Sequence, residues 1–335
     1  MNDCYHSILT DEKSRGYIIY AEIKLDELDI LIARELKLDA RQSNRKLSVQ
    51  LGVGATAIAK RLRRMVDANI LSFCCVVDPR LLGFQSSALF LLKIRPGKEA
   101  KVAQVLQQHG CVQSINQVVG QYDVLVYTVF RDHRRQLRWK INELGTLKDV
   151  QSYMEIHQLQ MMKNSWGGYA DRESVLGADI QPSDVDESEL RLIGALEINP
   201  RENINSLAKK VGLTRQTAAK KLQRLFDEDT MRIISVIDPV AIGFSLHAVI
   251  LLQVEFDRLL SLADIMTAHK STSHVAIVDS TYNLLVAAAF RDLGEMSHFL
   301  RSELGEMTGV IHRETLIHIE PPRMSYQLMR ALDYE

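Results

Sequence analysis

The chain has 335 residues, 46% of them hydrophobic and 25% charged, which favours a globular protein of two or three domains. Its formal net charge of −1 excludes a polycation, so any binding of nucleic acid must come from local basic patches. No apolar run approaches the roughly 18 residues of a membrane span, and the acidic N-terminal region is unlike a signal peptide, so we expect a cytoplasmic protein that does not contact a membrane.

The chain repeats itself. Residues 1–23 have no clear counterpart and are interpreted as an N-terminal arm, either disordered or adding a strand. From Leu25 onward, residues recur at a constant offset of 160 positions over about 135 residues; Gly52, for example, corresponds to Gly212. A constant offset over this length predicts duplication of a two-part unit.

The first part of each unit is predicted to be three short helices. In the first copy we expect them at residues 26–38, 44–51 and 55–68. A strand pair at residues 70–77 follows as a small wing. The second and third helices have the length and turn of a helix-turn-helix, a motif that places its last helix in the major groove of DNA.

The stretch at residues 211–224 shows this pattern most clearly. Gly212 permits the turn, and Thr214 is placed to cap the next helix. Ala218 and Leu222 form an apolar back, while the front carries amide, hydroxyl and cationic groups suited to base edges and phosphates. The predicted DNA-binding residues in the two copies are Thr56, Lys60, Arg63, Arg64, Arg215, Gln216, Thr217, Lys220 and Arg224.

The two predicted reader helices differ at their start. Gly54-Ala55 in the first copy replaces Thr214-Arg215 in the second. The first helix is more basic, and the second has more hydrogen-bonding side chains. Cations supply affinity for phosphate, and polar side chains discriminate between bases. We therefore expect the helix of the first copy to contribute mainly affinity for DNA and the helix of the second copy to contribute mainly sequence specificity. A solvated basic face is the alternative.

The second part of each unit alternates strands and helices in the order βαββαβ, which is typical of a ferredoxin-like sandwich. In the first copy the elements are expected at residues 86–94, 98–109, 112–119, 122–130, 133–144 and 150–158. In the second copy they are expected at residues 246–254, 259–269, 273–279, 282–290, 293–304 and 310–319. The strand at 122–130 is apolar on both faces, so the face without helices needs a cover. The other sheet of the chain is the simplest cover, in a pseudo-dimer within one chain or a homo-oligomer between chains.

These patterns predict an α+β protein with two winged helix-turn-helix domains and two ferredoxin-like domains in tandem. The predicted parts are the arm at 1–23, helix-turn-helix domain 1 at 24–79, ferredoxin-like domain 1 at 80–159, a linker at 160–184, helix-turn-helix domain 2 at 185–239, ferredoxin-like domain 2 at 240–322 and a tail at 323–335. The linker, about 25 residues long with Gly167-Gly168 and Pro182, would let the second helix-turn-helix sit far from the first sheet.

The order of a helix-turn-helix and βαββαβ resembles the Lrp/AsnC family of transcriptional regulators. The motifs that carry the resemblance are Leu25-Asp26-x-x-Asp29, the turn at Leu51-Gly52, Asp78-Pro79-x-x-x-Gly83 and Gly120-Gln121-Tyr122-Asp123. The resemblance implies sequence-specific binding to double-stranded DNA and an effector, often an amino acid, bound at contacts between sheet domains. Family members usually carry one unit, so this chain looks like a covalently linked version of the family dimer.

The GxYD turn of the first copy is the candidate effector site. Gly120 lets the backbone approach a ligand, Tyr122 lies beside it, and Asp123 can accept a hydrogen bond from an α-amino group. The alternative is that Gly120 and Asp123 only close a tight hairpin. The second copy has Ser280 and Asn283 in place of this glycine and carboxylate, so the site is expected in copy one.

One enzymatic alternative remains. Siroheme decarboxylases resemble the same family, and in them a His precedes a Tyr-Asn-Leu strand, as His274 precedes Tyr282-Asn283 here. The basic residue expected between them to hold a tetrapyrrole carboxylate is absent, and Ser114 replaces the His in copy one. No other catalytic motif is present, and the four cysteines lack metal-binding spacing. We therefore expect a regulator that is not an enzyme and has no cofactor or metal.

Overall fold

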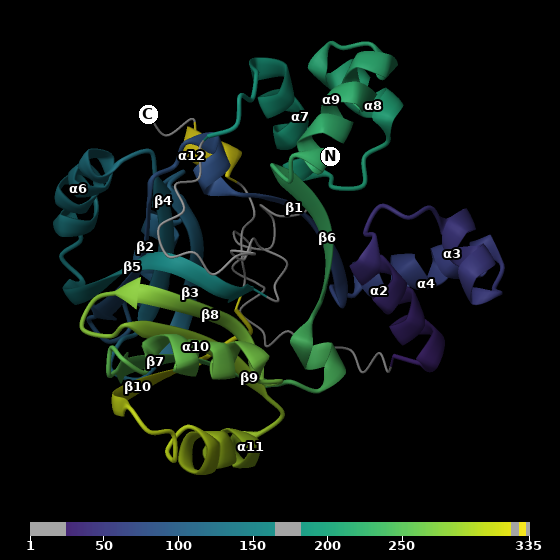
Figure 1. Ribbon diagram of the computed structural model, residues 1–335. Coiled ribbons are helices and arrows are strands. Elements are labelled where there is room, and N and C mark those ends of the chain that lie inside the picture. The colour runs from purple at the N-terminus through teal and green to yellow at the C-terminus, as the bar shows by residue number, and fades with distance from the viewer. Residues whose placement is uncertain (1–24, 165–181, 323–327, 333–335) are drawn as a thin grey trace.

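The computed structural model describes residues 25–164, 182–322 and 328–332. The arm expected at residues 1–23 lies outside these ranges, as do most of the expected linker and tail. Within them the chain is an α+β protein with two helical units beside one large β-structure (Figure 1).

Each helical unit contains the three helices that the sequence predicts. They are α2 (Glu27–Leu38), α3 (Asn44–Leu51) and α4 (Ala55–Asp67) in the first copy, and α7 (Glu187–Ile198), α8 (Ile204–Val211) and α9 (Arg215–Asp227) in the second. Gly52 and Gly212 end the second helices with φ of 66° and 71°, a left-handed conformation that glycine adopts without steric cost.

The first helix of each unit begins with a reciprocal cap. The carboxylate of Asp26 accepts a hydrogen bond from the backbone N–H of Asp29, whose own carboxylate accepts one from the N–H of Asp26. Asp186 and Glu189 repeat the arrangement in the second copy. This capping box satisfies amide groups that a helix start would otherwise leave unpaired, so the acidic motif after Leu25 fixes where the helix begins.

The strand after each helix-turn-helix forms no wing within its own unit. β1 (Leu71–Val77) and β6 (Met231–Ile237) pair with each other in an antiparallel ribbon, with Leu71 opposite Ile237 and Val77 opposite Met231. This corrects the wing expected at residues 70–77. A single seven-residue strand has no turn on which to fold back, and it finds its partner in the other copy. Helix α2 packs on β6 and α7 packs on β1, so the ribbon joins the two units.

The remaining strands form the two predicted βαββαβ sets. In the first set the elements are β2 (Ser86–Ile94), α5 (Glu99–Leu106), β3 (Val112–Val119), β4 (Val124–Phe130), α6 (His133–Asn142) and β5 (Val150–Asn164). In the second set they are β7 (Leu246–Val254), α10 (Leu259–Ala268), β8 (Thr272–Asp279), β9 (Leu284–Phe290), α11 (Leu293–His298) with a π-helical turn at Phe299–Glu303, and β10 (Val310–His318).

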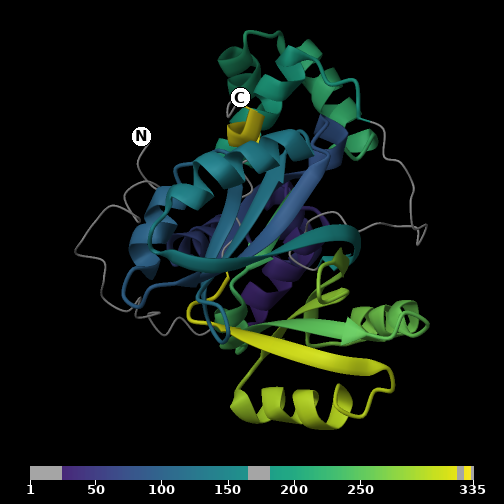
Figure 2. The same cartoon turned by 90° about the vertical axis from the view of Figure 1, so that its left-hand side faces the viewer.

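The two sets close into one eight-stranded barrel in the order β10-β3-β4-β2-β5-β8-β9-β7. The helices cover the outside of the barrel (Figure 2). Leu91, Leu251 and Leu316, each fully buried, meet inside it. Burial of one leucine contributes about 2 kcal/mol, so this interior gives the second apolar face of each sheet its cover. The cover comes from the same chain.

The two seams of the barrel differ in length. β5 pairs with β8 over a long stretch, from His157 opposite Asp279 to Asn164 opposite His274. β10 pairs with β3 only at its end, where Ile317 and His318 face Val119 and Val118. Because β5 continues to Asn164, residues 160–164 are strand, which corrects the start of the expected linker.

The second helical unit lies against the first half of the barrel, contrary to the expected separation. Its core contains Leu192 and Leu222 together with Phe84 and Val129 of the first half. A short helix near the C-terminus, α12 (Met329–Leu332), packs on α7 and adds to the same core (Figure 1).

Candidate DNA-binding surface and effector site

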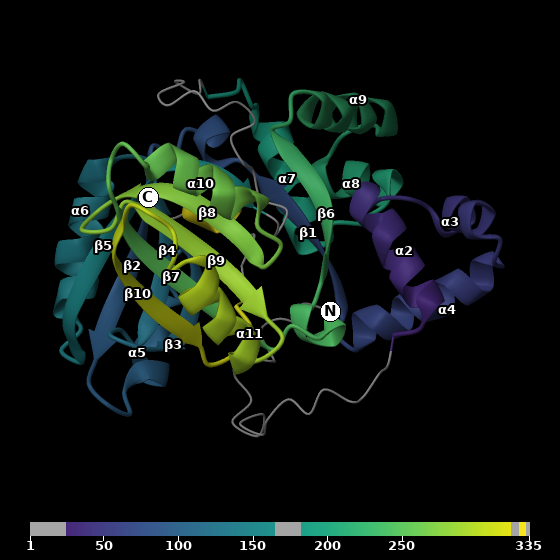
Figure 3. The same cartoon turned by 60° about the horizontal axis from the view of Figure 1, so that its bottom comes forward.

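Helices α4 and α9 present the polar faces that the sequence predicts. Ile58 and Leu62 bury the back of α4, while Ala218 and Leu222 bury the back of α9. Both helical units lie on the same side of the barrel and are joined by the ribbon of β1 and β6 (Figure 3). Eight of the nine predicted DNA-binding residues are solvent-exposed: Thr56, Lys60, Arg63, Arg64, Arg215, Gln216, Thr217 and Lys220. Arg224 is partly exposed.

Arg64 and Arg224 are committed to partners inside their own units. Arg64 forms an ion pair with Asp29, which is fully buried. Arg224 forms the equivalent pair with Glu189, 1% exposed, and its Nε donates to that carboxylate at 2.9 Å. Hydrogen bonding to Glu189 raises the pKa of Arg224 above its ordinary value. These arginines tie the third helix of each unit to the capped start of the first.

A second cation reinforces each of these ties. Arg61 Nη1 lies 2.6 Å from Asp26 and 3.0 Å from Asp29, and Lys221 pairs with Asp186 in the second copy. The hydrogen bond from Arg61 lowers the pKa of the exposed Asp26 carboxyl from its ordinary value. Each helix-turn-helix is therefore clamped by its own ion-pair network. Among the predicted DNA-binding cations, Lys60, Arg63, Arg215 and Lys220 are exposed and take no part in these networks.

The starts of the two reader helices differ as predicted. The hydroxyl of Thr214 accepts a hydrogen bond from the N–H of Thr217 at 3.1 Å, and the two threonine hydroxyls lie 2.8 Å apart. Gly54, at the same position before α4, makes no side-chain cap. The N-terminal turn of α9 is thus held by a cap that costs about 1 kcal/mol to remove, whereas the start of α4 carries no such constraint.

Gly120 is required by the packing of its turn. Its φ of 151° lies in a region that favours glycine, and an added Cβ would come within 2.6 Å of Leu316 Cδ2 and 3.1 Å of Thr315 O. The turn before β4 therefore presses its backbone against β10 of the other half. Tyr122, 7% exposed, projects from this turn into the barrel interior.

Both carboxylate oxygens of Asp123 accept hydrogen bonds from other residues of the chain. Its Oδ2 accepts a hydrogen bond from the N–H of Ile94 at 2.7 Å, and Lys93 Nζ donates to Oδ1 at 2.9 Å. These bonds tie the end of β2 to the start of β4. These interactions favour the hairpin interpretation of Asp123 over its predicted contact with an α-amino group.

Glu314 is a residue that the sequence interpretation missed. The backbone N–H of Gln121 donates to Glu314 Oε1 at 3.4 Å, so this carboxylate of β10 borders the turn of the other copy. Burial raises the pKa of Tyr122 and of Tyr282, and the negative charge of Glu314 raises both further. The imidazole of His312 stacks on the ring of Tyr282, with centroids 6.0 Å apart. No local pattern could reveal this cluster, because it brings Gln121 and Tyr122 of the first half beside Glu314 of the second.

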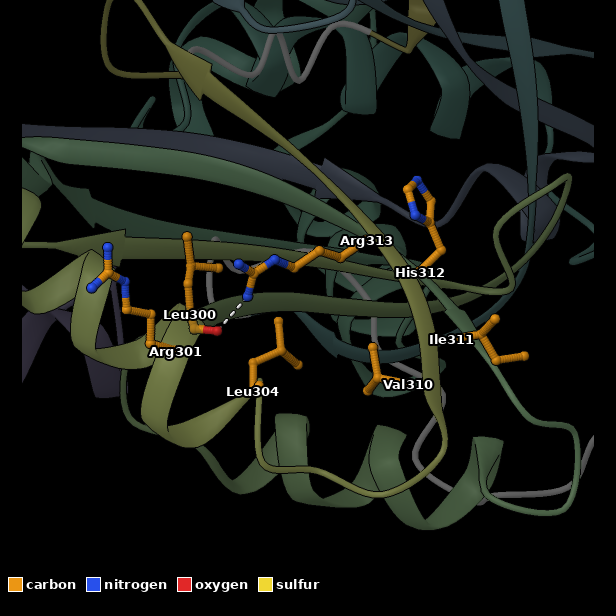
Figure 4. A pocket seen from close by; sticks show the side chains of 8 residues that line it. Leu300, Arg301, Leu304, Val310, Ile311, His312 and Arg313 are labelled. Atoms are coloured by element: carbon orange, nitrogen blue, oxygen red, sulfur yellow. Dashed lines mark hydrogen bonds between the residues drawn. The ribbon is translucent and has the colours of Figure 1, made fainter.

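A surface hollow of about 420 Å³ lies on the outer side of β10 (Figure 4). The side chain of Arg313 crosses it and donates a hydrogen bond to the carbonyl of Leu300. The lining comes from the π-helical turn and the first half of β10, and none of the predicted effector residues is part of it.

Within residues 25–164, 182–322 and 328–332, no group of three or more His, Cys, Asp or Glu side chains is placed to hold a metal ion. Among the helices so described, none is long and apolar enough to cross a membrane.

Two helix-turn-helix units that present basic, polar helices on one side of a common frame define a DNA-binding protein. Residues 25–66 match the AsnC-type helix-turn-helix domain. The transcriptional regulator AzlB of Bacillus subtilis is 30% identical over 126 residues, which are 36% of this chain and 80% of AzlB. The HTH-type transcriptional regulator FL11 of Pyrococcus abyssi is 25% identical over 130 residues, 38% of this chain and 85% of FL11. The chain belongs to the Lrp/AsnC family of transcriptional regulators.

The full two-unit arrangement also has a solved counterpart. The siroheme decarboxylase NirDL has a TM-score of 0.62 at 14% identity, covering 92% of this chain and 98% of that one. Its complex with an iron-uroporphyrin III analogue gives a TM-score of 0.63 at 15% identity. At this level of identity the likeness shows that the tandem fold is shared and says nothing about the chemistry of this chain.

Proposed function

We propose that one chain binds one stretch of double-stranded DNA, with α4 and α9 in successive major grooves about 34 Å apart. The observation that carries the proposal is that both units sit on one ribbon made from β1 and β6, on the same side of the molecule. In this proposal the two predicted helix-turn-helix domains, residues 24–79 and 185–239, bind DNA. The two predicted ferredoxin-like domains, residues 80–159 and 240–322, form the barrel.

The two readers are not equivalent, so we propose an asymmetric DNA site. Arg215, Gln216 and Thr217 stand exposed on the capped first turn of α9, where hydrogen-bonding groups reach base edges. Helix α4 offers Lys60 and Arg63, which suit phosphates. A homodimer with two identical readers favours a near-palindrome, whereas this chain has no such restriction.

We further propose that an amino-acid-like effector binds where the Gly120–Tyr122 turn meets β10. Asp123 is tied up by Ile94 and Lys93, so Glu314 supplies the carboxylate that accepts from an α-amino group. An effector bound here touches both halves of the barrel at once. The effector can change the relative position of α4 and α9 only if it binds one arrangement of the two halves more tightly than another. The size of the shift in this equilibrium is set by the difference between the two affinities.

The test begins with selection of binding sequences from random duplexes by the full chain, followed by footprinting with and without a panel of amino acids. We expect one non-palindromic protected site per chain and a change in affinity with one or a few of the amino acids. A perfectly palindromic consensus, or protection by two chains per site, would overturn the asymmetric reading. An effector response that survives Glu314→Gln would overturn the effector site.

The decarboxylase alternative is weaker. It rests on the shared fold and on His274, which lies in the half of the barrel that contains Tyr282-Asn283. The strand between them, from Val275 to Asp279, carries no basic residue that could hold a tetrapyrrole carboxylate. The curated relatives named above are regulators.

A further inference from the structure

Two arginines at equivalent positions of the two copies, Arg41 and Arg201, join the helix-turn-helix units to each other. Arg41 donates from Nη1 to the carbonyl oxygen of Pro200 at 2.9 Å and from Nη2 to that of Glu202 at 3.0 Å. Arg201 donates from Nη2 to the carbonyl oxygen of Gln42 at 2.6 Å. Because Gln42 and Glu202 also occupy equivalent positions, the contact is reciprocal.

Each arginine lies in the rigid turn between the first and second helices of its unit. The backbone N–H of Arg41 donates to Asp39 Oδ1 at 3.0 Å, and that of Arg201 donates to Asn199 Oδ1 at 3.3 Å. Gln42 is 4% exposed and is tied to the end of α2 by a 2.8 Å bond from its Nε2 to Glu35 O. Donors and acceptors are thus held by the helices that they connect.

The guanidinium groups are turned toward protein. Arg201 lies over the ring of Phe73 in the ribbon, with its Cζ 4.7 Å from the ring centroid. Burial lowers the pKa of Arg41 and of Arg201 from the ordinary value, although an arginine remains charged throughout the physiological range. Charge-assisted hydrogen bonds of this kind are about twice as strong as neutral ones, so three of them form a firm brace.

We propose that Arg41 and Arg201 are positioning residues that hold α4 and α9 at one separation, so that the chain accepts only one spacing between its two half-sites. The inference rests on the proposed function. A two-stranded ribbon is marginally stable by itself and twists readily, so β1 and β6 alone would leave the separation loosely defined. The brace acts at a second point, between the helical turns, and two separated contacts fix an orientation that one contact leaves free.

The test uses the selected DNA site and a series of duplexes in which the half-sites are moved apart or together by one base pair at a time. The wild-type chain should show a sharp optimum. In the double variant Arg41→Ala/Arg201→Ala, affinity at the optimum should fall about tenfold while sites shifted by two base pairs bind almost as well, because the second reader is no longer presented in register. Binding to a single half-site should not change.

Arg63→Ala is the matched control, because it removes an exposed cation from α4 and leaves the brace intact. It should weaken binding at every spacing and keep the optimum. The variant Arg41→Lys/Arg201→Lys should restore part of the spacing preference, since an ammonium group can still reach one carbonyl. An unchanged spacing profile in the double alanine variant would overturn the proposal, as would an equal loss on the single half-site, which indicates direct contact with DNA.

A measurement without DNA separates failure of this inference from failure of the proposed function. Spin labels at Val49→Cys and Lys209→Cys, two exposed and equivalent positions, report the distance between the units in a chain with Cys4 and Cys74 replaced by serine. We expect a narrow distance distribution that broadens in the double alanine variant. A distribution of the same width would refute the brace whether or not the chain binds DNA.

Discussion

Asp123 and Asn283 occupy equivalent positions of the two copies, and both tie the end of one strand to the start of another. Asp123 Oδ2 accepts from the N–H of Ile94, and Asn283 Oδ1 accepts from the N–H of Val254 at 2.8 Å. Asn283 also donates from Nδ2 to the carbonyl of Val254 at 2.7 Å. An amide therefore performs the structural task of the carboxylate, which separates that task from ligand binding.

The first prediction follows from this equivalence. Asp123→Asn should leave stability and the effector response nearly unchanged. Asp123→Ala should destabilise the chain by about 1–3 kcal/mol, because it leaves the N–H of Ile94 without its acceptor. Denaturant unfolding and effector titration of both variants measure this. If Asp123→Asn keeps full stability but loses the effector response, the Asp123 carboxylate binds the effector.

The second prediction concerns the exposed cations and the polar reader. Lys60→Ala/Arg63→Ala should weaken binding to all sequences and reduce the slope of log affinity against log salt by about 2, if each cation neutralises one phosphate. Gln216→Ala/Thr217→Ala should lower the preference for the selected site over its single-base variants. Gel-shift titrations at several salt concentrations distinguish the two. If neither pair alters binding, the assignment of α4 and α9 as readers is wrong.

The third prediction concerns the arginine of the clamp. Arg64→Ala should destabilise the first helical unit by about 1–3 kcal/mol, because it removes a partner of the buried Asp29 carboxylate and leaves only Arg61. The neighbouring Arg63→Ala should change stability by less than about 0.5 kcal/mol. Unfolding curves of the two variants provide the comparison. Equal stability of the two variants would show that the ion pair between Arg64 and Asp29 does not stabilise the helical unit.

The fourth prediction concerns pH. Both carboxylate oxygens of Glu197 accept from the N–H of Met329 at the start of α12, at 3.3 and 3.2 Å, and burial raises the pKa of Glu197 from 4.5 to about 8. The folded chain holds a proton that the unfolded chain releases, so this contribution to stability is complete below pH 4.5 and is lost as pH rises through 8.

Glu197→Gln should therefore remove a fall in stability of at most about 1.4 kcal/mol per pH unit across that window. The measurement is the free energy of unfolding of wild type and variant from pH 5 to pH 9. Parallel curves for the two proteins would contradict the prediction.

The fifth prediction concerns the enzymatic alternative. Burial lowers the pKa of His274 to about 4, so its ring is neutral near pH 7. His274→Ser, which installs the residue of copy one, should leave DNA affinity and its pH dependence above pH 6 unchanged. Titration of the wild-type chain with an iron tetrapyrrole should give no new Soret band. A band that disappears in His274→Ser would instead support the enzyme.

The bounds of several strands were predicted closely from the sequence. The ranges 86–94 and 246–254 agree with β2 and β7 to the residue, because apolar side chains fill both faces and the turn residues on either side are distinct. The wing was mispredicted because the partner of β1 lies 160 positions away, and local sequence carries no information about such a pairing. The length of β5 was underestimated for the same reason, since its last residues are strand only because β8 lies beside them.

The candidate sites show a similar limit. Helical spacing correctly put Lys60 and Gln216 on an exposed face. The same spacing correctly put Arg64 on that face, but it could not reveal the ion pair with the buried Asp29, because Asp29 comes from another helix. Glu314 was missed because it reaches the Gly120 turn across the barrel, and the offset of 160 places only Met154 at its position in the other copy.

Closure of the barrel within one chain has a consequence for how such a regulator responds to its own abundance. A regulator assembled from separate subunits must reach a threshold concentration before it acts, and it can exchange subunits with related proteins. Here both halves of the barrel are parts of one chain, so closure of the barrel does not depend on the concentration of a second subunit. Because the two halves are encoded separately within that chain, each can accumulate changes that its counterpart does not share.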